Sequence, residues 1–171
     1  AHYSFLGLNP PGLSDAYADC WEQVCNHTRS NYAYCVDNPK GYAGYGADCW
    51  GLTASDIPDG YTASSPTNDR GVIAPTAALS SMPYTPDESM AALRFFYYKL
   101  GDKLWSDYGF IDAFDLTTGW FDRGMHIAID QGPIVVMIEN YRTGLPWNLF
   151  MSDKDVQRGL AELGFTVEAG S

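Results

Sequence analysis

The stretch that decides the fold is Ile129-Asp130-Gln131-Gly132-Pro133-Ile134-Val135-Val136-Met137-Ile138-Glu139-Asn140-Tyr141-Arg142-Thr143-Gly144. Its continuous apolar run, Ile134 to Ile138, suits either a helix buried on most sides or a strand. The preceding proline, the distance to Gly144 and the polar Glu-Asn pair after the run favour a helix. We therefore predict a helix that begins near Gly132-Pro133 and runs to Arg142.

Helical patterns recur outward from this stretch. We expect further helices over residues 13–30, 74–81, 85–100 and 152–164. The clearest start is Thr85-Pro86-Asp87-Glu88, which has the residues of a capping box. Residues 31–70 and 102–123 are instead rich in Gly, Pro, Asp and aromatic residues, and loops this long in a compact domain are usually functional. The pattern predicts an all-α fold with long loops.

Composition excludes several classes of protein. The 171 residues are 46% hydrophobic and carry a net charge of −11, so the chain is neither disordered nor suited to nucleic acid or anionic membrane surfaces. No apolar run is long enough to cross a membrane. The four cysteines have no CxxC spacing and the three histidines no HExxH frame, so we expect no metal and no cofactor. Free buried thiols and disulfides to Cys35 or Cys49 both remain open.

Asp130 is the sharpest candidate for catalysis. A carboxylate beside a helix start meets unpaired backbone N–H groups and the positive end of the helix dipole, which favour its ionised form. That environment suits a general base or a ligand-binding carboxylate. An ordinary helix cap is the alternative interpretation.

Glu139 and Arg142 lie three residues apart and share a helix face. One interpretation is an internal ion pair that orients Arg142. The alternative is that Asn140 and Arg142 project into a cleft and bind a polar ligand.

Aromatic residues and aspartates alternate in the predicted loops. Aromatic faces stack on sugar rings, while neighbouring Asp, Asn and Arg side chains bind the hydroxyls. The pattern therefore suits a neutral, polyhydroxylated ligand, and packing of the loops on themselves is the alternative. The residues concerned include Trp50, Trp105, Trp120, Tyr42, Tyr45, Tyr61, Asp48, Asp56 and Asp69.

Several longer strings resemble the glucoamylase-like domain family of Bacteroidetes, which is related to the endo-β-1,2-glucanases. The strings follow the family order across nearly the whole chain, and the last is the most specific. They are His2-Tyr3-Ser4-Phe5-Leu6-Gly7-Leu8, Tyr17-Ala18-Asp19 with Trp21-Glu22, Asn38-Pro39-Lys40, Cys49 to Asp56, Gly71 to Ser81, Tyr108 to Phe114 and Ile129 to Gly144.

This resemblance implies an (α/α)6 toroid more than twice the length of this chain. Residues 1–171 would be a single C-terminal portion of the catalytic domain, comprising two to three helical hairpins. It also implies inverting hydrolysis of a β-1,2-glucan-like substrate, with Asp130 as the general base. Substrate contacts are expected among the cleft residues, namely His2, Trp50, Asp56, Trp120, Asn140 and Arg142.

The family's general acid is a glutamate upstream of the His2 string, and no position here matches its motif. We therefore expect the chain to need the missing N-terminal part or a second chain. A non-catalytic glucan-binding fragment and an assembly fragment are the alternatives. The resemblance also implies a periplasmic or secreted protein, although this stretch carries no signal sequence.

Overall fold

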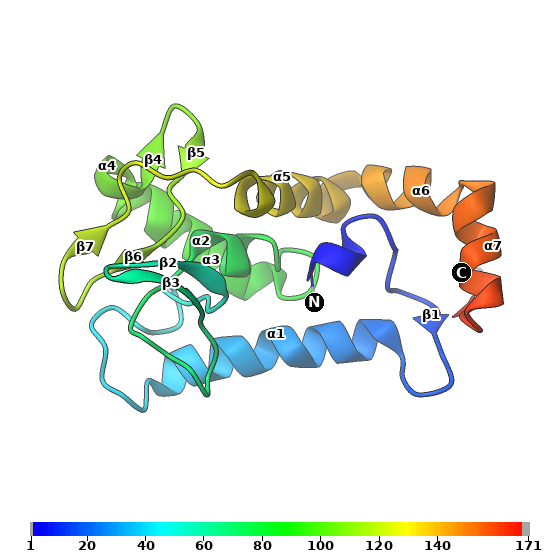
Figure 1. Ribbon diagram of the computed structural model, residues 1–171, viewed down its shortest axis with the longest axis horizontal. Coiled ribbons are helices and arrows are strands. Elements are labelled where there is room, and N and C mark those ends of the chain that lie inside the picture. The colour runs from blue at the N-terminus through cyan, green and yellow to red at the C-terminus, as the bar shows by residue number, and fades with distance from the viewer. Residues whose placement is uncertain (1, 169–171) are drawn as a thin grey trace.

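The computed structural model describes residues 2–168, and helices dominate this part of the chain. Helix α1 extends along one side of the molecule, while α5 and α6 follow one another along the other side (Figure 1). Helices α2 and α3 lie between these two sides, and α2 contacts both α3 and α5. The helices are α1 (Cys20–Asp37), α2 (Pro75–Leu79), α3 (Pro86–Tyr98), α4 (Gly101–Leu104), α5 (Ala128–Thr143), α6 (Leu145–Met151) and α7 (Lys154–Glu162), with a 3-10 turn, η1 (His2–Phe5).

Short antiparallel strands correct the expectation of an all-α chain. Three local hairpins occupy the predicted loops, and a fourth pair joins the two ends of the described chain. The hairpins gather at one end of the molecule, where the long loops meet (Figure 1). The pairs are β2 (Ala54–Ile57) with β3 (Gly60–Ala63), β4 (Trp105–Ser106) with β5 (Gly109–Phe110), β6 (Phe114–Asp115) with β7 (Trp120–Phe121), and β1 (Leu13–Ser14) with β8 (Thr166–Val167).

Helix α1 begins and ends later than the sequence predicts. Ser14, the expected cap, lies in β1, and the cap is Asp19, whose carboxylate accepts the backbone N–H of Glu22 at 2.7 Å. An aspartate at this position satisfies a backbone donor that the helix leaves unpaired. The helix ends at Asn38, which adopts a left-handed φ of 45°. Residues 31–37, predicted as loop, are therefore its last two turns.

Helix α5 begins four residues before the predicted start at Gly132. Ile127 is its N-cap and provides no side-chain cap, and Pro133 lies inside the helix. Proline fits a helix backbone angle but has no N–H to donate, so it removes one backbone hydrogen bond near the start. Asp130 consequently lies inside the first turn of α5, whereas the sequence pattern places it just before the helix.

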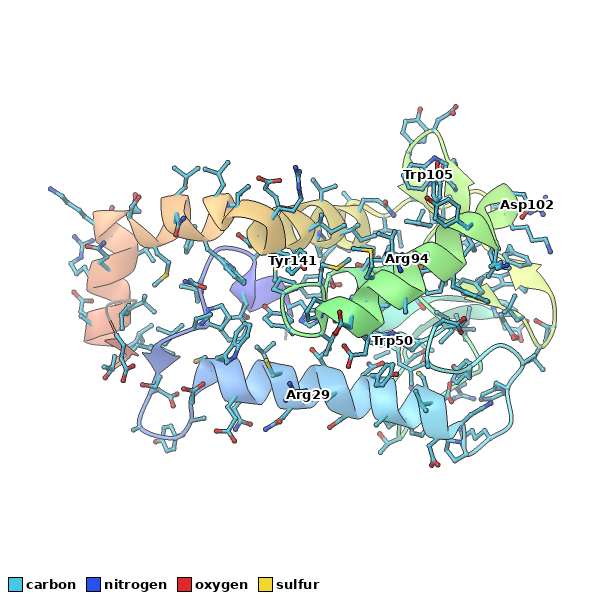
Figure 2. All side chains as sticks on the ribbon, turned by 180° about the vertical axis from the view of Figure 1, so that it is seen from behind. Arg29, Trp50, Arg94, Asp102, Trp105 and Tyr141 are labelled. Atoms are coloured by element: carbon cyan, nitrogen blue, oxygen red, sulfur yellow. The ribbon has the colours of Figure 1, made fainter. Side chains whose placement is uncertain are left out.

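The main core lies where α3 meets the hairpins. Phe96 is fully buried and packs edge-on against Phe114, with ring centroids 5.7 Å apart. Trp50 lies between α1 and α3 (Figure 2), where its indole N–H donates to the Glu88 carbonyl at 3.2 Å. Thr85 is the N-cap of α3 as predicted, but its hydroxyl faces Ser89 at 3.2 Å and makes no cap hydrogen bond.

The cysteines are free thiols, as the first of the two interpretations predicts. Cys25, Cys35 and Cys49 are buried and Cys20 is half-buried. Cys35 and Cys49 pack in the main core, where burial raises the pKa of the Cys35 thiol to about 11. These thiols therefore stay protonated and act as small apolar side chains. Over residues 2–168, no helix combines the length and apolar character that a membrane span requires.

Replacing Phe96 with alanine tests the core. We expect Phe96→Ala to lower the free energy of unfolding by about 3–5 kcal/mol, because it leaves a cavity among fully buried rings. Denaturant titration measures this change. The matched control is Tyr98→Ala in the same helix, since Tyr98 is 77% exposed and its loss should cost under about 0.5 kcal/mol. Equal effects of the two changes would contradict the assignment of Phe96 to the core.

Candidate active site

Asp130 is a buried carboxylate, 3% exposed, in the first turn of α5. Its Oδ1 accepts the hydroxyl of Tyr3 at 3.3 Å, and its backbone carbonyl accepts the hydroxyl of Thr76 at 2.8 Å. Partial burial and the neighbouring Asp130 raise the pKa of Tyr3 to about 12, so the phenol remains a donor. Because the side chain caps no helix end, the interpretation of Asp130 as an ordinary helix cap is wrong.

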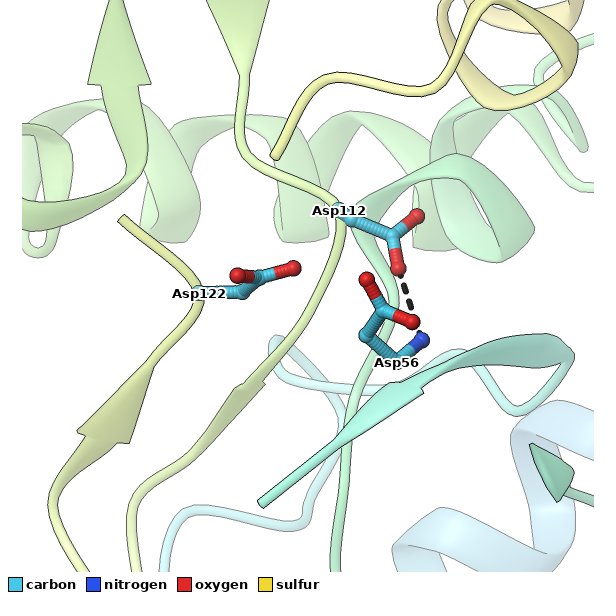
Figure 3. A group of neighbouring side chains, drawn as sticks. All are labelled: Asp56, Asp112 and Asp122. Carbon is cyan, nitrogen blue, oxygen red and sulfur yellow. Dashed lines mark hydrogen bonds between the residues drawn. The ribbon is translucent and has the colours of Figure 1, made fainter. Parts of the chain in front are cut away.

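Asp130 adjoins a group of three further aspartates from separate segments. Asp112 precedes β6, Asp56 lies in β2 and Asp122 follows β7, and their side chains converge (Figure 3). One carboxylate oxygen from each of these three lies within 4.8 Å of the others. The backbone N–H of Asp56 donates to Asp112 Oδ2 at 2.8 Å, and the Asp112 side chain is within hydrogen-bonding reach of Asp130. We call these four residues the acid cluster.

Burial changes the protonation of this cluster. Burial is the main cause that raises the pKa of Asp112 to about 7, and the neighbouring Asp130 and Asp56 carboxyls add to it, while the Asp56 N–H opposes it. Burial and Asp56 likewise raise the pKa of Asp122 to about 6. When two carboxyls are in contact, their pKa values differ, because ionising both at once brings two negative charges together. Asp112 therefore titrates near neutral pH and Asp122 somewhat below it.

Three carboxylates of the acid cluster converge as metal ligands do. Asp56, Asp112 and Asp122 could each give one oxygen to a cation, and a hard cation such as Mg²⁺ would keep several waters in its other positions. One oxygen of Asp112 already accepts a backbone N–H. The ion pairs of the described residues involve only Glu139, Arg142, Asp155, Arg158 and Glu162, so no Lys or Arg ion pair among them neutralises the cluster.

A hydrogen-bonded clamp holds the N-terminal segment, and with it Tyr3, against α5. The amide of Asn140 donates to the Leu6 carbonyl at 3.1 Å and accepts the backbone N–H of Trp147 at 3.0 Å. The Trp147 indole then donates to the Phe5 carbonyl at 2.7 Å. This corrects the expectation that Asn140 binds substrate, because both ends of its buried amide are occupied by the backbone.

A polar cavity of about 60 Å³ lies beside Tyr3. It is lined mainly by hydroxyl, amide and imidazole side chains, and Thr76 connects its wall to Asp130. His2, a predicted substrate contact, forms part of the wall, and its Nε2 faces the Ser81 hydroxyl at 2.8 Å. Burial lowers the pKa of His2 to about 3, so the imidazole is neutral. A cavity of this size and polarity admits water or a ligand hydroxyl.

The remaining predicted contacts occupy different places. Trp50 lines the cavity but is fully buried, which corrects its expected role as a stacking platform on a loop. Asp56 belongs to the acid cluster, and Trp120 lies half-buried in β7, two residues before Asp122. Arg142 pairs with Glu139 at 3.3 Å on the exposed face of α5, as the first interpretation predicts. It is about 18 Å along the helix from Asp130.

Sequence reasoning missed Tyr3, Asp112 and Asp122 as site residues. Tyr3 and Asp112 stand inside the family strings but were not singled out. A usable signal for Asp112 is its setting, Phe110-Ile111-Asp112-Ala113-Phe114, because an aspartate inside an apolar run must be buried or paired. Asp122 lies between a basic and an aromatic residue, and nothing in that pattern indicates its neighbours.

Comparisons with known proteins agree along nearly the whole chain. The family model described as "Putative glucoamylase" matches residues 1–154. An exo beta-1,2-glucooligosaccharide sophorohydrolase (non-reducing end) of Parabacteroides distasonis is 51% identical over 164 residues, 95% of this chain. The structure of a "putative glucoamylase" from Bacteroides uniformis has a TM-score of 0.95 and 66% identity over 97% of this chain. The endo-beta-1,2-glucanase of Chitinophaga pinensis, in complex with sophorotriose and glucose, has a TM-score of 0.93 and 55% identity over 96%.

These relatives are much longer than the matched region. The chain spans 23% of the sophorohydrolase and 40% of each of the two solved structures. The similarity nevertheless extends over almost every residue described here, and the family model covers far more than half of the sequence. The chain therefore belongs to the glucoamylase-like family that this model describes.

Proposed function

We propose that this chain is the base-bearing portion of an inverting β-glucan hydrolase, with Asp130 as the general base. The observation that carries the proposal is the environment of Asp130, a buried carboxylate held by Tyr3 at the start of α5. A general base must be ionised and fixed in orientation, and the free N–H groups of a helix start favour the ionised form. The names of the relatives point to β-1,2-linked glucans as the substrate class.

The general acid belongs to another part of the same catalytic domain in this proposal. Inverting glycosidases place their two carboxyls about 6.5–9.5 Å apart, so that water fits between the base and the sugar. Asp112 lies within hydrogen-bonding reach of Asp130, which is too close for that arrangement. The donor to the leaving oxygen is therefore expected opposite this cluster, across the cleft.

Exposed apolar side chains along α5 and α6 support a larger assembly. Large apolar side chains of these helices are about half or more exposed. We propose that the preceding part of an (α/α)6 toroid, or a second chain, covers them, and that the protein acts in the periplasm or outside the cell. The residues are Ile129, Val135, Tyr141, Leu145, Leu149 and Phe150.

Replacing Asp130 with asparagine tests the base. We expect Asp130→Asn in the assembled protein to reduce sugar release from β-1,2-glucan by about 10²–10⁴-fold, because the base can no longer accept a proton. The melting temperature should stay nearly unchanged, since asparagine has the same shape and accepts the Tyr3 hydroxyl. Reducing-end assays and thermal unfolding measure the two effects.

The matched control for this test is Glu139→Gln in the same helix. Glu139 pairs with Arg142 on the exposed surface, and its neutralisation should leave the rate unchanged. Wild-type sugar release by Asp130→Asn would rule out Asp130 as the base. Glucan binding measured by calorimetry, with no sugar released by the unaltered assembled protein, would instead support the binding-module alternative.

The chain alone should not form a stable, active monomer. We expect it to associate or to gain stability with the preceding part of the domain, because association removes the exposed apolar side chains of α5 and α6 from water. Size exclusion with light scattering measures the mass of the species in solution. A monodisperse 18.8 kDa monomer that releases sugar would defeat this prediction.

A further inference from the structure

Asp112 is the most deeply buried member of the acid cluster, at 1% exposed, and the proposed reaction does not yet use it. It follows Ile111 and precedes Ala113, both buried, so its carboxyl cannot turn out to solvent without unpacking the core. Its Oδ2 is fixed by the Asp56 N–H at 2.8 Å. The orientation of the whole carboxyl group is thus set by the backbone of β2.

The second oxygen of Asp112, Oδ1, is buried and receives no hydrogen bond from a described residue, although buried polar atoms nearly always have a partner. The Asp112 side chain lies within hydrogen-bonding reach of the Asp130 carboxyl. Two carboxyls at this distance attract one another only when one of them carries a proton, and repel when both are ionised.

Charges and donors around the pair decide which carboxyl holds that proton. Asp130 already accepts the Tyr3 hydroxyl, which makes it the acceptor of the pair. Around Asp112 the other titratable groups are the half-buried Asp56 and Asp122, with His126 beside Asp122. Asp56 acts on Asp112 itself and opposes its ionisation, whereas His126 acts on Asp122.

We propose that Asp112 is a positioning residue, whose protonated carboxyl donates a hydrogen bond from Oδ1 to the Asp130 carboxylate. This inference rests on the proposed role of Asp130 as the base. With Tyr3 as a second donor, the carboxylate of Asp130 is held in one orientation and kept ionised. Burial raises the pKa of Asp112 to about 7, consistent with a proton held through the acidic range.

Two variants of Asp112 separate the donor from the charge. In Asp112→Asn, the amide oxygen can still accept the Asp56 N–H while the amide N–H donates to Asp130. In Asp112→Leu, the donor is lost at similar size. We expect Asp112→Asn to keep kcat/KM on β-1,2-glucan within about tenfold, the scale of one exchanged hydrogen bond, and Asp112→Leu to lose roughly 100-fold from misplacement of the base.

The pH profile distinguishes positioning from a merely structural role. A carboxylate that loses a donor holds its own proton to higher pH, so the acid limb of kcat/KM should move up by about one to two pH units in Asp112→Leu. It should stay in place in Asp112→Asn. The control is Asp115→Leu, which removes a buried aspartate whose partners, Thr117 and Thr118, lie in its own turn. That variant should leave the acid limb unmoved.

Carboxyl NMR of the assembled, unaltered protein tests the pair even if a variant fails to fold. With aspartate labelled at the carboxyl carbon, we expect one resonance to titrate near pH 7 and to shift again where a second carboxyl titrates at lower pH. An unmoved acid limb in Asp112→Leu, or a set of aspartates that all titrate below about pH 5, would overturn the proposal. Sugar release by Asp130→Asn would instead overturn the proposed function, and the NMR titration would still report on the pair.

Discussion

The buried amide of Asn140 is the contact on which the arrangement of the site depends. It binds the Leu6 carbonyl and the Trp147 N–H, so one side chain joins the N-terminal segment, α5 and α6. Removing a buried partner from such a network leaves unpaired polar groups, which costs about 1–3 kcal/mol each. Because Leu6 is fixed in this way, Tyr3 is brought to Asp130, more than a hundred residues later in the chain. The Asn140 amide therefore positions Tyr3 without itself contacting Asp130.

The N-terminal end of α5, where Asp130 lies, is close to three loops that carry the other acids. Asp56 comes from the first hairpin, Asp112 from the segment before β6 and Asp122 from the segment after β7. Burying several carboxyls together without a basic partner opposes folding, and proteins tolerate such arrangements mainly at functional sites. Protonation of Asp112 reduces this repulsion, because the protonated carboxyl carries no charge. The packing of the hairpins thus buries Asp112 and raises its pKa.

Local patterns predicted α1, α2, α3, α5 and α7, missed α4 and α6, and gave little of the contacts between helices. Pro75, Pro86 and Asp153 lie at or beside the expected helix starts, because proline and caps act within one turn. The hairpins were missed, since strands of two to four residues carry too little alternation to detect. Asp130 was found because its neighbours in sequence are informative. Tyr3 and Asp112 reach it through tertiary packing, which periodicity does not encode.

In the proposed inverting mechanism, the base and the acid would be two carboxyl groups on separate segments. A base that activates water and an acid that protonates the leaving oxygen act from opposite sides of the sugar. A single packed cluster cannot supply both, because carboxyls in contact share a proton, as Asp112 and Asp130 do in the proposed pair. In the proposed mechanism, an acid placed on a separate segment would have a proton affinity independent of the cluster.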